Sequence, residues 1–106
     1  NGISPNFVHS MDAAALHLYV NLASEHGLHA FSLVHDSYGT LAADTEVSAC
    51  CIREVFVRMY QNDVLANFRT ELLELLSEKN AQKLPPVPPK GTLDLEMVKQ
   101  GAFFFA

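Results

Sequence analysis

The chain has 106 residues, of which 49% are hydrophobic and 18% charged, with two cysteines and no tryptophan. This length and composition fit one small globular domain and exclude a disordered or collagen-like chain. No apolar run approaches the roughly 20 residues that span a bilayer, so no membrane segment is predicted.

Charge is divided unevenly between the two halves of the chain. All seven Lys and Arg residues lie from Arg53 onward, and residues 1–52 contain acids but no Lys or Arg, so the net charge of −5 belongs to the first half. Non-specific affinity for nucleic acid comes from cations, so we do not expect this piece alone to bind nucleic acid. An anionic substrate would need a divalent metal or basic residues from elsewhere; an acidic solvated surface is the alternative interpretation.

The ends of the sequence suggest a longer protein. The chain starts at Asn1 inside what reads as a continuing segment, and it finishes with the aromatic run Phe103–Phe105. Exposed phenylalanine rings at a terminus are unfavourable unless they pack, so we expect them to be buried against other structure in the native protein.

The first predicted element is a helix over residues 11–26. Ser10 is a good N-cap residue, Asp12 lies in the first turn, where the helix dipole favours an acid, and Gly27 supplies a stop.

A β-hairpin is predicted over residues 29–42. Its first strand alternates in character, with Phe31, Leu33 and His35 on one face. A tight two-residue turn at Asp36–Ser37 leads to the returning strand, although the turn lacks the glycine that favours such hairpins.

The remainder predicts helices followed by extended chain. Two apolar stripes, the second capped by Asn62 or Asp63, predict a helical hairpin over residues 44–79 that packs on the sheet. The proline-rich run over residues 84–91 is incompatible with helix or central strand and predicts an extended strap. A short helix over residues 94–100 precedes the aromatic tail.

The segment after the first predicted strand is the candidate site. At a turn, the Asp36 carboxylate can reach a metal ion or substrate while the strand fixes its position. Capping of the turn backbone by the same carboxylate is the alternative interpretation. The consecutive residues His35, Asp36 and Ser37 cannot converge as a catalytic triad. The adjacent Cys50 and Cys51, in a sequence without CxxC or HExxH, do not indicate a zinc site.

Several motifs together resemble a known family. They are Gly-Ile-Ser-Pro-Asn-Phe-Val-His-Ser-Met-Asp at residues 2–12, His-Asp-Ser-Tyr-Gly-Thr at residues 35–40, Ala-Asp at residues 43–44 and Pro-Lys-Gly-Thr-Leu-Asp-Leu at residues 89–95. Together these motifs resemble the C-terminal part of the single-subunit, phage-type DNA-directed RNA polymerases. That family includes mitochondrial enzymes, and the resemblance covers essentially the whole chain in order.

The resemblance implies a fold and an organisation. Residues 1–106 would be a C-terminal, palm-proximal fragment of a larger polymerase. The fold would be α+β, with helices packed on a small antiparallel hairpin and a strap and C-terminal foot over residues 84–106. At the end of that foot, Phe105 and Ala106 would fold back toward the active site.

The resemblance also implies roles for individual residues. Asp36 would be one carboxylate of a palm motif that binds two Mg²⁺ ions for nucleotidyl transfer, and His35 would orient it or pack beside it in the catalytic site. His9 and Asn6 would contact the RNA–DNA hybrid near the growing end. DNA template, nascent RNA and nucleoside triphosphates are the implied partners, together with the remainder of the polymerase chain.

Departures from the family pattern carry further expectations. The family's second metal-binding aspartate and the catalytic lysine and tyrosine of its nucleotide-binding helix lie upstream and are missing here, so the fragment alone is expected to be inactive. The end reads Phe-Phe-Phe-Ala, with an extra aromatic residue compared with phage members. Ser37 and Gly39 resemble phage members, whereas mitochondrial members carry Cys and Trp there. The implied location is therefore the cytoplasm of a bacterial host of a phage or prophage rather than a mitochondrion.

Two alternatives remain open. A family A DNA polymerase usually reads His-Asp-Glu at this motif, and Ser37 removes the second carboxylate. A non-catalytic interaction module would instead present the proline-rich strap and aromatic tail to a protein partner.

Overall fold

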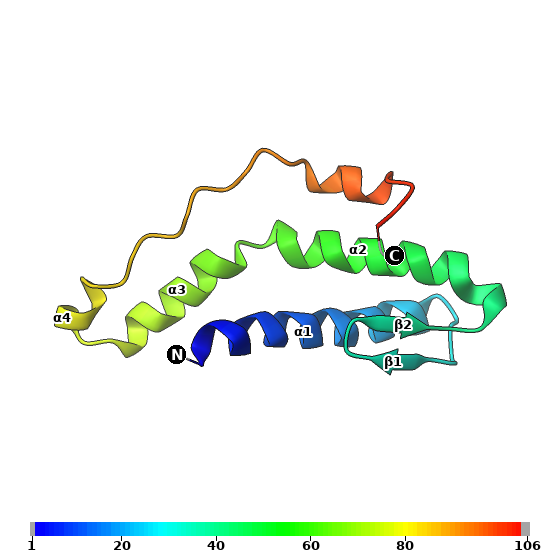
Figure 1. Ribbon diagram of the computed structural model, residues 1–106, viewed down its shortest axis with the longest axis horizontal. Coiled ribbons are helices and arrows are strands. Elements are labelled where there is room, and N and C mark those ends of the chain that lie inside the picture. The colour runs from blue at the N-terminus through cyan, green and yellow to red at the C-terminus, as the bar shows by residue number, and fades with distance from the viewer. Residues whose placement is uncertain (1, 105–106) are drawn as a thin grey trace.

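A computed structural model describes residues 2–104 and shows an α+β fold, as expected (Figure 1). Its elements in chain order are α1 (Ile3–Glu25), β1 (Ser32–Val34), β2 (Ser37–Gly39), the 3-10 helix η1 (Ala42–Asp44), α2 (Thr45–Gln61), α3 (Val64–Leu75), α4 (Glu78–Ala81) and the 3-10 helix η2 (Leu95–Lys99). No helix among these residues is long and apolar enough to cross a membrane.

Helix α1 begins at Ile3, well before the predicted start at residue 11. The predicted cap at Ser10 is wrong because its hydroxyl lies inside the helix and donates a 2.7 Å hydrogen bond to the Phe7 carbonyl. Pro5 does not interrupt the helix, since it falls in the first turn, where an N–H has no intrahelical acceptor. The predicted stop is confirmed: Gly27 follows the helix with a φ of 88°, a conformation that glycine adopts without steric cost.

The core lies where α1 meets α2 and the hairpin. Tyr19 and Leu22 of α1 pack with Cys51 and Val55 of α2, and all four side chains are buried. The Tyr19 hydroxyl shares a buried 2.8 Å hydrogen bond with Ser48 Oγ on α2. This bond satisfies two polar groups that would otherwise be buried without partners.

The predicted helical hairpin over residues 44–79 is wrong, because α2 and α3 do not fold back on each other. Figure 1 shows α3 continuing away from α2, at the end of the molecule opposite the strands. Helix α1 and η2 pack on α2 and cover the faces that a hairpin partner would need. The predicted cap at Asp63 is confirmed, since its carboxylate accepts a 3.2 Å hydrogen bond from the Ala66 amide. Helix α3 ends at Leu75. The backbone of Leu76 is extended, so the residues that follow form the separate short helix α4.

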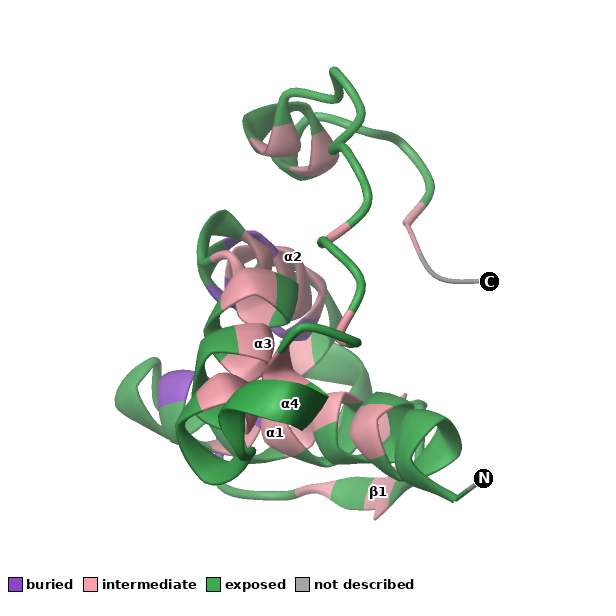
Figure 2. Cartoon of the chain, turned by 90° about the vertical axis from the view of Figure 1, so that its left-hand side faces the viewer, coloured by how far each residue is buried: buried purple, intermediate pink, exposed green. Residues whose placement is uncertain are grey.

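The predicted strap is confirmed as extended chain without regular structure over residues 85–94. Arg69 of α3 donates a 2.9 Å hydrogen bond to the Pro85 carbonyl, and Lys90 forms a 3.0 Å ion pair with Asp63. Figure 2 shows the buried positions gathered around α1 and α2, while most of the strap is exposed. The short helix predicted over residues 94–100 is confirmed as η2.

The tail after η2 lies against α2. Arg53 Nη2 donates a 2.8 Å hydrogen bond to the Gly101 carbonyl, and Lys99 forms a 2.8 Å ion pair with Glu54. The Phe104 ring contacts the Phe56 ring edge-on at a centroid distance of 5.0 Å. Phe104 therefore packs within this chain, whereas Phe103 is 93% exposed.

The molecule is extended for its length. Its radius of gyration is 16.9 Å, compared with about 13 Å for a compact domain of 100 residues. Much of its apolar surface is consequently left uncovered, including the large side chains of Ile3, Val8, Leu65 and Leu75.

Candidate functional site

The candidate site is the turn of the β1–β2 hairpin. Val34 pairs with Ser37 in the antiparallel register, which leaves His35 and Asp36 as the two turn residues. The predicted turn at Asp36–Ser37 is therefore displaced by one residue, and both strands are shorter than the predicted hairpin over residues 29–42.

The conformation of His35 explains the shift. Its φ is 52°, in the left-handed region, so His35 does not continue the face formed by Phe31 and Leu33. Two-residue hairpin turns favour positive φ because it matches the twist of the flanking strands. Among residues other than glycine, histidine adopts this region more readily than most.

Aromatic packing fixes the hairpin on the core. Phe31 and Leu33, predicted to share a face, both pack against the buried cluster, as does Tyr38. The Tyr19 ring meets Tyr38 and Phe31 edge-on, at centroid distances of 4.9 and 5.9 Å. Edge-to-face contacts of this kind stabilise by about 0.5–1.5 kcal/mol each beyond the burial of area. The base of the hairpin is thereby held, while His35, Asp36 and Ser37 are exposed at and beside its turn.

A second carboxylate lies near this hairpin. Burial raises the pKa of the Tyr38 hydroxyl, and the negative charges of Asp12 and Asp36 raise it further. The tyrosine therefore stays protonated at neutral pH, in the field of one carboxylate from α1 and one from the turn. Asp12 was not among the predicted site residues; its position at the end of the motif over residues 2–12 was the available signal.

The predicted nucleic-acid contacts His9 and Asn6 lie on the N-terminal half of α1, and both are exposed. Residues three apart on a helix share a face, so His9 neighbours Asp12. Figure 1 shows the hairpin running beside α1 with its turn directed toward that half of the helix. The turn thus points along α1 toward the half of the helix that contains Asn6 and His9.

The other predicted site residues are Phe105 and Ala106, which lie outside the described residues. The tail leading to them is held on α2 partly by charge. Hydrogen bonds from Lys99 and Arg58 lower the pKa of the Glu54 carboxyl, so this anchor is ionised at neutral pH.

The turn offers one carboxylate, that of Asp36, as an oxygen ligand. No group of three or more His, Cys, Asp or Glu that could hold a metal ion occurs within residues 2–104. Mg²⁺ commonly takes one or two carboxylates and completes its shell with water and substrate phosphates. The exposed Asp36 carboxylate fits that role.

The fold and site define an α+β unit that presents a carboxylate on a hairpin anchored by aromatic packing, and sequence comparisons identify the family. The family model for DNA-dependent RNA polymerase matches residues 1–84. Over 108 residues the chain is 43% identical to the DNA-directed RNA polymerase of Enterobacteria phage T3 and 41% identical to the T7 RNA polymerase of Escherichia phage T7. Each match covers 100% of this chain. DNA-directed RNA polymerase 1, mitochondrial, of Arabidopsis thaliana is 35% identical over 103 residues, which cover 96% of this chain and 10% of that protein.

The chain belongs to the family of phage-type, single-subunit DNA-dependent RNA polymerases. It spans 12% of the length of these two phage relatives.

Gly39 offers a test of how closely the hairpin strands must approach. A Cβ added at Gly39 would lie 3.1 Å from the Ser32 carbonyl oxygen, whereas one added at Gly91 would meet nothing within 4 Å. We expect Gly39→Ala to destabilise the hairpin by about 1–3 kcal/mol, as overpacking does. In the full-length polymerase, amide hydrogen exchange of the peptide covering residues 31–40 should accelerate about 5-fold or more. Gly91→Ala is the matched control and should leave this peptide unchanged; equal exchange in both variants would contradict the close packing.

Proposed function

We propose that this chain supplies the palm-proximal, C-terminal part of an enzyme that polymerises ribonucleoside triphosphates on a DNA template, with Asp36 as a carboxylate ligand of Mg²⁺. The observation that carries the proposal is the exposed Asp36 carboxylate at the turn of an anchored hairpin, in a chain that belongs to the RNA polymerase family. When bound, a pair of Mg²⁺ ions would stabilise the attacking 3′-oxygen and the leaving pyrophosphate.

The chain's own contribution is to place that carboxylate. Precise sites are built on elements whose side chains are locked by packing, and Tyr19 locks the hairpin through Phe31 and Tyr38. His35 precedes Asp36 in the turn with a left-handed backbone, and we assign it the role of orienting the carboxylate. A metal ligand also explains how an acidic first half can meet a triphosphate, because the ion offsets the repulsion between like charges.

The proposed nucleic-acid contacts are His9 and Asn6 on the exposed part of α1, which would lie along the RNA–DNA hybrid near the growing end. Phe105 and Ala106 would form a foot beside the active site. Contacts of Arg53 with the carbonyls of Gly101 and Ala102 support this assignment, because they hold the chain leading into the foot.

The proposed partners are DNA template, nascent RNA, nucleoside triphosphates and the rest of the polymerase chain. The proposed location is the cytoplasm of a bacterium that carries a phage or prophage. Identities of 41–43% to the two phage polymerases and 35% to the Arabidopsis mitochondrial enzyme support that location.

Substitution of Asp36 tests the proposal directly. Asp36→Asn in the full-length polymerase keeps the size of the side chain but removes the charge that binds metal. Promoter-independent RNA synthesis should fall about 1,000-fold or more, since metal stabilisation contributes several kcal/mol to the transition state. Glu46→Gln removes an exposed acid from the first turn of α2 and should leave synthesis unchanged. Wild-type activity in Asp36→Asn would favour the interaction-module alternative.

The isolated 106-residue chain should not synthesise RNA. It supplies Asp36 but lacks the second metal-binding aspartate and the catalytic lysine and tyrosine that the family resemblance implies. Incorporation of labelled ribonucleotides on a primed DNA template measures this, with the full-length polymerase as the positive control. Any templated product from the purified fragment would show that the prediction is wrong.

We expect His9 to affect binding of the RNA–DNA hybrid more than the rate of nucleotide addition. In the full-length polymerase, His9→Ala is expected to shorten transcripts and speed dissociation of the RNA–DNA hybrid, with single-nucleotide addition near the wild-type rate. His17→Ala is the control on the same helix, because the His17 ring is exposed and its Nδ1 lies 2.7 Å from the Ala13 carbonyl oxygen. Unchanged processivity in His9→Ala would contradict the proposed contact between His9 and the hybrid.

A further inference from the structure

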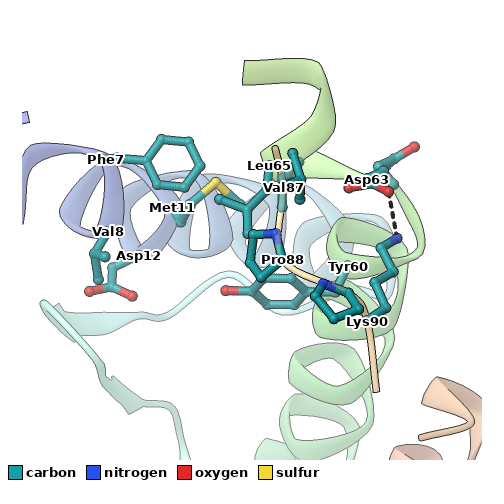
Figure 3. Close-up of a pocket in the computed structure, with 13 residues that line it drawn as sticks. Phe7, Val8, Met11, Asp12, Tyr60, Asp63, Leu65, Val87, Pro88 and Lys90 are labelled. Carbon is teal, nitrogen blue, oxygen red and sulfur yellow. Dashed lines mark ion pairs between the residues drawn. The ribbon is translucent and has the colours of Figure 1, made fainter. Parts of the chain in front are cut away.

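An open apolar groove lies where the N-terminal half of α1, the α2–α3 junction and the strap meet (Figure 3). Its volume is about 390 Å³, within the range of about 300–1,000 Å³ of functional pockets. Three elements supply its principal apolar side chains: Phe7, Val8 and Met11 from α1, Tyr60 and Leu65 from the α2–α3 region, and Val87 from the strap.

The walls of the groove are fixed by contacts within the chain. The Phe7 ring packs at a tilt of 31° against Phe68 of α3, with a centroid distance of 4.6 Å, and this contact joins α1 to α3. The strap wall is tied at both ends, by Arg69 to the Pro85 carbonyl and by Lys90 to Asp63. Consecutive prolines between these ties restrict the backbone further. The groove is therefore preformed, which lowers the entropic cost of filling it.

Large apolar groups face solvent around this groove. Val8 is 57% exposed and Leu65 is 45% exposed. A contiguous exposed apolar patch usually marks an interaction surface.

Charges at the rim select the kind of occupant. Asp12 lines one end of the groove, and among the described residues that line it the one cation, Lys90, is already paired with Asp63. Figure 3 shows the Asp12 carboxylate and this ion pair on opposite sides of the apolar residues. Within residues 2–104, a phosphate backbone in the groove would meet the Asp12 carboxylate with no unpaired lining cation beside it, which disfavours nucleic acid. An apolar segment that carries a Lys or Arg fits both the interior and the Asp12 rim.

We infer that this groove is the docking site for an apolar segment of the polymerase's own remaining chain, one that places a Lys or Arg opposite Asp12. The inference rests on the proposed function in one respect, that this chain works within a full-length polymerase. The phage relatives support it, because 88% of their length lies beyond the match to this chain. Docking there would join the N-terminal half of α1, which carries His9 and Asp12, to the rest of the enzyme.

Photo-crosslinking in the full-length polymerase tests the occupant. The photoreactive residue p-benzoylphenylalanine replaces Val8 or Leu65 in the groove. It replaces Leu75 as a matched control, since Leu75 lies on the same helix as Leu65, is 83% exposed and does not line the groove. Mass spectrometry after irradiation identifies the joined peptides. Both groove positions should crosslink within the same molecule to one apolar peptide outside residues 1–106 that contains Lys or Arg, and position 75 should not reach that peptide.

Each other outcome overturns the inference. Crosslinked dimers would identify a second copy as the occupant, and adducts with the template would identify nucleic acid. Crosslinks confined to residues 1–106, the same peptide from position 75, or no crosslink at all would show that no specific segment fills the groove.

A stability comparison provides an independent readout. Leu65→Lys should lower the melting temperature of the full-length polymerase, because docking would bury the new charge. Leu75→Lys should not change it. Equal melting temperatures for both variants and wild type would overturn the inference even if RNA synthesis still depends on Asp36, so the two proposals fail separately.

Discussion

The fold depends on what surrounds one buried side chain, that of Tyr19. Its hydroxyl joins α1 to α2 through Ser48, and its ring supports the hairpin through Phe31 and Tyr38. The two strands form a ladder of three residues each, and an isolated two-stranded hairpin is marginally stable in water. The position of Asp36 is therefore determined by the packing of Tyr19 more than by the sheet itself.

Local signals in the sequence were sufficient where structure depends on near neighbours. The Gly27 stop, the Asp63 cap and the extended strap follow from properties of single residues, and the structure confirms them. The start of α1 was missed because Ser10, although a favoured cap residue, can also lie inside a helix when its hydroxyl donates back to a carbonyl, here that of Phe7. The turn was misplaced by one residue because His35 accepts the left-handed conformation that is usually assigned to glycine.

The local sequence pattern did not predict which elements pack against each other. Apolar stripes show that a helix has a buried face but not which element covers it, so α2 and α3 were wrongly paired although α1 and η2 take the faces of α2. The candidate site also depends on packing that the local sequence pattern does not predict. Asp36 was placed in the turn from sequence, but the approach of Asp12 to Tyr38 depends on how α1 lies against the hairpin. The partners of the basic residues in residues 53–106 were likewise not predicted. Five of these side chains contact carbonyl or carboxylate oxygens of the same chain: Arg53, Arg58, Arg69, Lys90 and Lys99.

The strap acts as a spacer of fixed length. Surface connections usually tolerate insertions and deletions, but this one is tied near Pro85 and Lys90, and the η2 segment beyond it is seated on α2 through Lys99 and Glu54. Extended proline-rich chain advances about 3 Å per residue. One added or missing residue would therefore move η2 by about 3 Å along the strap. That shift is enough to separate Lys99 from Glu54, so the length of the strap is matched to the distance between its ties and the seat of η2 on α2.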